Sequence, residues 1–157
     1  MESVVENVVK EPKKFVDRSK ICPVLLRVFI GKGRHNSTSE YARGKTPSHE
    51  VQLYTWMDAT LKELMNLIRA LGDEGRQKGS QFEFSVVYAD LRSPNFKMRD
   101  IGKTIVGNAT QDDFATLLSK KFQIGDFLDV AITAPKKIYK ATNNDISTLR
   151  RVRHRPY

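Results

Sequence analysis

Histidine, cysteine and paired carboxylates are the side chains from which this sequence could build a reactive or metal-binding site. His35, His49 and His154 lie far apart and have no cysteine or carboxylate at ligand spacing, whereas a structural zinc site usually needs four such groups. Cys22 precedes Pro23 at a strand edge and has no basic or histidine neighbour that would activate it as a nucleophile. The sequence therefore predicts no metal site and no catalytic cysteine.

Two further patterns look like parts of enzymes but have simpler explanations. A Gly-Lys-Gly run at 31–33 follows a predicted strand, yet no Gly-Lys-Ser/Thr run and no helix start come after it, as a phosphate-binding loop requires. The paired aspartates at 112–113 fit a helix cap, and Asp126 and Asp129 fit a turn and a strand face. Because no nucleophile, base and orienting group can be combined, we predict a protein that is not an enzyme and uses no cofactor.

The net charge of +9 is concentrated near one end of the chain. After Thr133 there are seven Lys or Arg residues and one Asp, whereas residues 21–133 hold fifteen basic and thirteen acidic residues and are nearly neutral. Such a basic tail could bind nucleic-acid phosphates, or it could serve as a solubilising segment or a nuclear-localisation signal, and charge alone leaves both interpretations open. The arginines concerned, in the closing RRVRHRPY, are Arg150, Arg151, Arg153 and Arg155.

Length and composition describe a single soluble domain with extended ends. The chain of 157 residues suits one ordinary domain, 39% of its residues are hydrophobic, and no apolar run approaches the ~20 residues that a membrane helix requires. The first residues lack the basic start and the apolar stretch of a secretory signal, so we expect an intracellular protein without an internal disulfide. We predict a flexible N-terminal tail at 1–20, a folded domain at 21–134 and a basic C-terminal tail at 135–157.

Hydrophobic periodicity predicts one main helix and a set of strands, in an order that suggests an α+β fold with the helix lying across a mixed sheet. Thr60 and Glu63 are spaced as a capping box, and apolar residues recur every three or four positions at 61–71. A brief second helix is expected at 112–118, and the aperiodic stretch at 31–50 is long enough to be functional or mobile. Alternating apolar and polar residues predict the strands at 24–30, 51–56, 82–88, 96–101 and 127–133.

Several stretches resemble the Sin-associated eighteen-kilodalton polypeptide family. They are ICPVLLRVF, RGKTPSHEVQLYTWMDATLKEL, FEFSVVYADLR, KFQIGDFLDVAIT and the closing Arg-Pro-Tyr. The resemblance covers about 21–133 and the final residues, and the sequence departs from the family pattern at 31–39, 72–79 and 104–121. It implies a ubiquitin-like β-grasp fold, a mixed sheet of about five strands packed on one main helix, which agrees with the order of elements above.

The resemblance also implies a non-catalytic nuclear adaptor. Members of the family are associated with a Sin histone-deacetylase corepressor complex and, separately, with the apoptosis- and splicing-associated complex, in which acinus or pinin and an SR-related RNA-binding protein are partners. The protein expected from this resemblance links transcriptional repression with pre-mRNA splicing. It resides in the nucleus, including nuclear speckles, with some in the cytoplasm, and it contacts RNA only indirectly and no membrane. The alternative is an RNA- or DNA-binding protein that acts through its basic C-terminal tail.

In a β-grasp fold the helix covers one sheet face, and strand parity assigns side chains to the two faces. We predict that the second face is an exposed aromatic patch rimmed by charge, which binds partners, and that Arg27 and Asp129 pair across neighbouring strands. Two alternatives are that Trp56 folds under the long loop into a secondary core and that a free sheet edge accepts a partner strand. The predicted patch comprises Arg27, Phe29, Tyr54, Trp56, Phe127 and Asp129. The predicted helix side comprises Leu26, Val28, Leu53, Leu64, Ile68, Phe84, Val86, Leu128, Val130 and Ile132.

Overall fold

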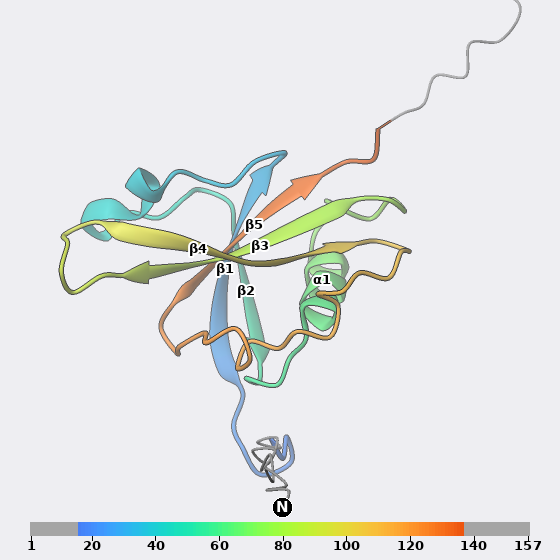
Figure 1. Ribbon diagram of the computed structural model, residues 1–157, viewed down its shortest axis with the longest axis horizontal. Coiled ribbons are helices and arrows are strands. Elements are labelled where there is room, and N and C mark those ends of the chain that lie inside the picture. Colours follow the sequence, from blue (N-terminus) through green and yellow to red (C-terminus); the bar gives the residue numbers. More distant parts are fainter. Residues whose placement is uncertain (1–15, 137–157) are drawn as a thin grey trace, which may run out of the picture.

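A five-stranded mixed sheet with one α-helix across one face makes up most of residues 16–136, the part of the chain that the computed structural model describes (Figure 1). The elements are β1 (Val24–Lys32), the 3-10 helix η1 (Thr38–Gly44), β2 (Glu50–Thr55), α1 (Leu61–Leu71), β3 (Gln81–Ala89), β4 (Phe96–Ile105) and β5 (Phe127–Thr133). The strand order is β2-β1-β5-β3-β4; β1 and β5 are parallel, and the other neighbours are antiparallel. This is the order of a ubiquitin-like β-grasp, so the predicted α+β fold is confirmed.

Helix α1 begins and ends where its sequence signals place it. The backbone N–H of Glu63 donates to the Thr60 hydroxyl at 3.1 Å, and the N–H of Gly72 donates to the carbonyl of Ile68. Only half of the predicted capping box forms, because the Glu63 carboxylate binds Arg18 instead of the backbone at the cap. Of the helices described for residues 16–136, none is long and apolar enough to cross a membrane.

The core lies between α1 and the sheet. The alternation of side chains along the strands correctly predicted which residues face the helix. All ten side chains predicted for the helix side are buried in one cluster, and none of them is more than 7% exposed. Leu61, Leu64, Met65 and Ile68 supply the apolar face of α1. Burial of such side chains is worth about 1.5–3 kcal/mol each, which makes this cluster the main source of fold stability.

Two segments after β3 differ from the prediction. Strand β4 runs to Ile105 and so extends past Gly102. A register shift between Phe84 and Ser85 of β3 leaves Ile101 without a partner, and Gly102 gives the backbone room to pass close to Leu61. The helix expected at 112–118 is replaced by turns. The reason is that the carbonyls of Asp113 and Ala115 accept hydrogen bonds from the first N–H groups of α1.

The long connection between β1 and β2 is ordered over η1 and covers part of the sheet face opposite α1 (Figure 1). Its helix begins with a capping box in which Ser37 accepts from Ser39 and Glu40 accepts from the N–H of Ser37. Tyr41, at the centre of η1, is only 1% exposed. The predicted open face of the sheet is therefore only partly open.

Candidate partner-binding surface

A second buried cluster fills the part of the sheet face under η1. Phe29 is fully buried, its ring centroid lies 5.4 Å from that of Tyr41 and 5.5 Å from that of Phe127, and the Tyr41 and Phe127 rings stack at 5.6 Å. The prediction that Phe29 is exposed is wrong, and Phe127 is only partly exposed, because η1 covers both rings. We call this group the covered cluster, and it comprises Phe29, Tyr41, Val87, Phe96, Met98 and Phe127.

Asp129 lies beside the covered cluster and is completely buried, so its predicted place on an exposed rim is wrong. Its carboxylate accepts hydrogen bonds from the Tyr41 hydroxyl, from the side-chain amide of Asn36 at 2.9 Å and from Nδ1 of His35 at 2.8 Å. The backbone N–H of Asn36 adds a bond of 3.3 Å. All of these donors come from the connection between β1 and β2, so Asp129 fastens that segment to the sheet.

The predicted ion pair between Arg27 and Asp129 does not form. Arg27 instead donates from Nε and Nη2 to the two carboxylate oxygens of Glu50, at 2.5 and 3.1 Å. Glu50 stands opposite Phe29 in the β1–β2 ladder and is therefore diagonal to Arg27. The guanidinium hydrogen bond from Arg27 lowers the pKa of the Glu50 carboxyl. Arg27 also lies 5.3 Å from the Phe127 ring centre, so it borders the covered cluster.

The open part of this face lies near the start of β1 and the end of β2. Tyr54 is 67% exposed, and its cross-strand neighbour Leu25 is 43% exposed. Ile21, which is 51% exposed, leads into β1, and its carbonyl accepts a 2.7 Å hydrogen bond from the indole N–H of Trp56. We call these four residues the Tyr54 patch: Ile21, Leu25, Tyr54 and Trp56.

Trp56 is partly exposed, and the group that covers it differs from the expected one. The alternative hypothesis placed it under the connection between β1 and β2. In the structure the Arg18 guanidinium lies 5.0 Å from the centre of the indole ring. Arg18 lies in the segment predicted to be a flexible tail, yet it packs on the domain through hydrogen bonds to Asp58 and Glu63. Trp56 therefore joins the open patch to the N-terminal segment.

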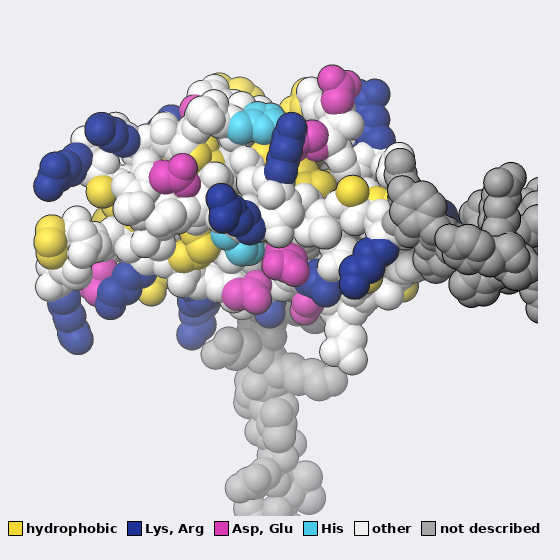
Figure 2. Space-filling model, turned by 90° about the horizontal axis from the view of Figure 1, so that it is seen from above, with side chains coloured by type: hydrophobic (Ala, Val, Ile, Leu, Met, Phe, Trp, Pro, Cys, Tyr) yellow, Lys and Arg dark blue, Asp and Glu magenta, His cyan; other side chains and the backbone are white. Residues whose placement is uncertain are grey.

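Charge is mixed on the surface of the described domain. On the face seen in Figure 2, Lys and Arg side chains alternate with Asp and Glu, and no area of a single sign dominates that view. This agrees with the near-neutral charge of residues 21–133. The predicted nucleic-acid or localisation residues Arg150, Arg151, Arg153 and Arg155 lie outside the described residues.

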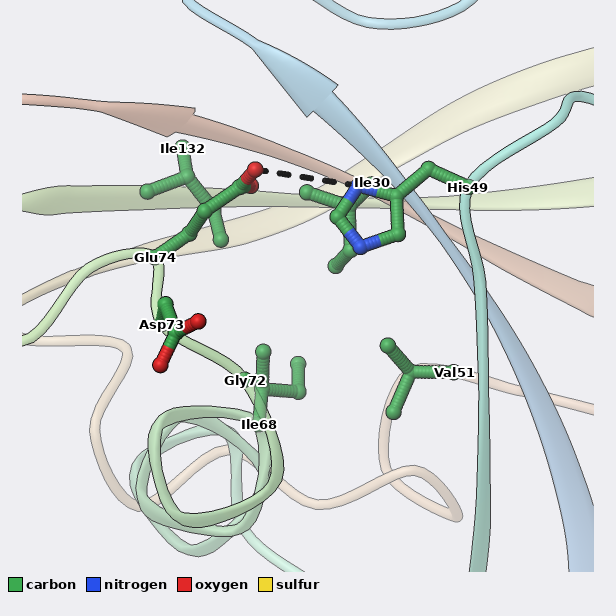
Figure 3. A pocket seen from close by; sticks show the side chains of 8 residues that line it. All are labelled: Ile30, His49, Val51, Ile68, Gly72, Asp73, Glu74 and Ile132. Carbon is green, nitrogen blue, oxygen red and sulfur yellow. Dashed lines mark ion pairs between the residues drawn. The ribbon is translucent and has the colours of Figure 1, made fainter.

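The pocket between the end of α1 and the sheet offers little chemistry. Its floor is apolar, and at its mouth Nδ1 of His49 lies 3.8 Å from a carboxylate oxygen of Glu74 (Figure 3). Lys32 approaches the same carboxylate at 3.3 Å. Across residues 16–136, no group of three or more His, Cys, Asp or Glu side chains is placed to hold a metal ion. The open Tyr54 patch is a better candidate than this pocket for a functional site.

Tyr41 should make the stability of the domain sensitive to alkaline pH. Burial raises the pKa of its phenol above the ordinary value, and the hydrogen bond to Asp129 raises it further. The folded state then keeps a proton that the unfolded state loses above about pH 10, so stability falls as pH rises through that range. In Tyr41→Phe this contribution is absent, and between about pH 10 and 11 the loss of stability should be smaller by about 1 kcal/mol.

The measurement is urea unfolding of the wild type and Tyr41→Phe at a series of pH values. The remaining titratable groups are common to both proteins, so their contributions cancel in the difference. Parallel curves for the two proteins would show that the Tyr41 phenol is not held protonated by the fold.

The described residues thus define a ubiquitin-like β-grasp domain whose second sheet face is covered at one end by η1 and open at the other. A family model described as "Sin3 associated polypeptide p18 (SAP18)" matches residues 15–132, and the chain belongs to this family.

Relatives from distant organisms match over most of their length. The "Histone deacetylase complex subunit SAP18" of Bos taurus is 51% identical over 133 residues, which cover 84% of this chain and 87% of the relative. The protein of the same name from Drosophila melanogaster is 50% identical over 137 residues, covering 85% and 91%. The Arabidopsis thaliana relative is 42% identical over 120 residues, covering 74% and 78%.

Proposed function

We propose that this chain is a non-catalytic adaptor subunit of a nuclear corepressor complex that contains histone deacetylase. The observation that carries the proposal is the similarity, at about half of all positions and over most of both chains, to proteins named as subunits of a histone deacetylase complex. A subunit of this kind contributes binding surfaces, which is the role that the geometry supports best.

The Tyr54 patch is the surface that we assign to partner binding. It gathers an exposed tyrosine, a tryptophan and two exposed aliphatic side chains beside the edge strand β2. Large aromatic side chains commonly dominate interface energies, and apolar groups that stay exposed together tend to mark binding sites. Of the six residues predicted for the site, Tyr54 and Trp56 keep this role in the proposal. Arg27 borders the covered cluster, and Phe29, Phe127 and Asp129 lie under or beside η1, so these four residues are not assigned to the binding surface.

A second assembly is proposed from the sequence resemblance. We infer that the same domain also joins an apoptosis- and splicing-associated complex with acinus or pinin and an SR-related RNA-binding protein. Its location would then be the nucleus, including nuclear speckles, with a cytoplasmic fraction. In this proposal RNA is held by the partner protein, which agrees with the near-neutral charge of residues 21–133.

Truncation after Pro135 tests the adaptor function against binding through the basic tail. Tagged wild-type and truncated chains are used to recover protein complexes from nuclear extract, and the histone deacetylase activity that they retain is measured. We expect the truncated chain to retain most of this activity, because the binding surface lies on the folded domain. Loss of activity on truncation, with an affinity that falls steeply as salt rises, would instead support the nucleic-acid alternative.

A further inference from the structure

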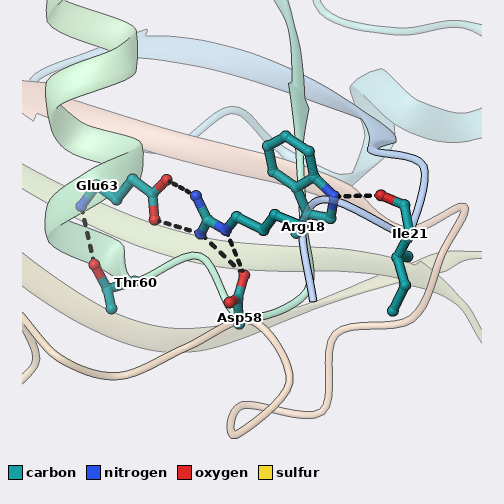
Figure 4. A network of polar contacts seen from close by, with 6 residues as sticks. Arg18, Ile21, Asp58, Thr60 and Glu63 are labelled. Atoms are coloured by element: carbon teal, nitrogen blue, oxygen red, sulfur yellow. Dashed lines mark hydrogen bonds and ion pairs between the residues drawn. The ribbon is translucent and has the colours of Figure 1, made fainter. Parts of the chain in front are cut away.

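Arg18 occupies a site that is built to recognise a guanidinium group (Figure 4). Its Nη1 and Nη2 donate to the two carboxylate oxygens of Glu63 at 2.8 and 3.0 Å. Its Nε and Nη2 both donate to one carboxylate oxygen of Asp58, at 3.1 and 2.9 Å. The guanidinium carbon Cζ lies over the Trp56 ring, 5.0 Å from its centre. We call Trp56, Asp58 and Glu63 the arginine site.

All three residues of the site come from one short stretch of the domain. Trp56 and Asp58 follow the end of β2, and Glu63 lies in the first turn of α1. Only arginine offers a planar fork that can satisfy two carboxylates and stack on an aromatic ring at once, whereas the lysine ammonium acts as a point charge. The site therefore selects arginine by geometry as well as by charge.

Arg18 stays partly open to solvent within the site, so a competing arginine could reach the same groups. The side chains of Arg18, Asp58 and Glu63 are each about one-third exposed, at 37%, 32% and 33%. Solvent reaches all three charged groups and competes for the same hydrogen bonds, which weakens the ion pairs. Among the hydrogen bonds described between residues 16–21 and the rest of the domain, the only other one joins Trp56 to the Ile21 carbonyl.

We propose that the arginine site binds an arginine side chain of a partner protein, presented in a turn like that of residues 17–21, and that Arg18 occupies the site when no partner is bound. The peptide residues beyond that arginine would reach Trp56, as the Ile21 carbonyl does now by accepting a hydrogen bond from the indole N–H. An apolar residue three positions after the arginine would take the place of Ile21. This inference rests on the proposed partner-binding role of the Tyr54 patch and adds the chemistry of the partner.

The test uses the full chain carrying Arg18→Ala and a blocked peptide, VDRSKI, which copies residues 16–21. The sequence contains one tryptophan, so a single indole N–H signal in the NMR spectrum reports on the site. We expect this signal to shift and saturate as peptide is added to Arg18→Ala. In the wild-type chain the shift should require more peptide, because Arg18 competes for the site.

Matched controls separate arginine recognition from simple charge attraction. The peptide VDKSKI, with lysine in place of arginine, should bind about tenfold more weakly or worse, because it loses the bidentate hydrogen bonds. Adding Asp58→Asn and Glu63→Gln to Arg18→Ala should abolish the shift while the rest of the spectrum stays dispersed. Equal binding of the two peptides, or no shift with either, would overturn the inference. The adaptor function would survive that result if the Tyr54 patch still proved necessary for capturing the complex.

Discussion

Asp129→Ala is expected to lower the free energy of unfolding by about 3–5 kcal/mol, because it leaves several donors without their acceptor. The Asp129 carboxylate is completely buried and accepts hydrogen bonds from the Tyr41 hydroxyl, the His35 ring and the Asn36 side chain. Urea unfolding measures the loss. The connection between β1 and β2 should also loosen, so trypsin should cleave faster after the exposed Arg34 and Arg43.

Asp73→Ala is the matched control for this substitution. The Asp73 side chain is 100% exposed, and its ion pair with Arg76 is a solvated surface contact. Its removal should change the free energy of unfolding by no more than about 0.5 kcal/mol. Similar small losses in both variants would contradict the account in which Asp129 fastens η1 to the sheet.

The main core could be predicted from sequence because it depends on short-range periodicity. Alternation along β1, β3 and β5 assigns their side chains to two faces, and the helical spacing of 61–71 identifies the stripe that packs on one of them. Thr60 marks the start of α1 through a hydrogen bond to the nearby Glu63. These signals need no knowledge of which distant segments meet.

The second sheet face could not be predicted because its cover comes from an aperiodic segment. Nothing around Tyr41 in the sequence distinguishes its buried aromatic ring from an exposed loop residue. The sequence did contain one indication, at Asp129. This carboxylate stands alone among apolar residues, with Phe127 and Ala131 on the same face of the strand. A lone carboxylate within an apolar strand is costly to bury unless donors surround it, so it indicates an anchor for another segment.

The arginine site was missed for a related reason. Arg18 and its partners Asp58 and Glu63 are separated by 40 and 45 residues, a distance that local patterns do not span. The spacing of Thr60 and Glu63 predicted a capping box, in which the Glu63 carboxylate would bind the backbone at the helix start. In the structure Thr60 caps the helix as predicted, but the Glu63 carboxylate binds Arg18. A site formed where a terminal segment meets a helix start is visible only once the fold is known.

A double variant that carries Tyr54→Glu and Leu25→Glu should recover little of the deacetylase complex from nuclear extract, while its domain stays folded. Both side chains are exposed on the same face, so two carboxylates can be accommodated by solvent in the free protein. In a complex they would be buried without partners. The expected loss of binding free energy is about 2 kcal/mol or more, which is roughly 30-fold in affinity.

Leu91→Glu is the matched control, since Leu91 is a fully exposed hydrophobic residue in the turn between β3 and β4 and lies outside the Tyr54 patch. The decisive measurement is the histone deacetylase activity recovered from nuclear extract by wild type, Tyr54→Glu with Leu25→Glu, and Leu91→Glu, each checked for folding by circular dichroism. The account predicts that only the patch variant loses the activity. Full recovery by a folded patch variant would contradict the claim that this open end of the sheet is where the protein binds its partners.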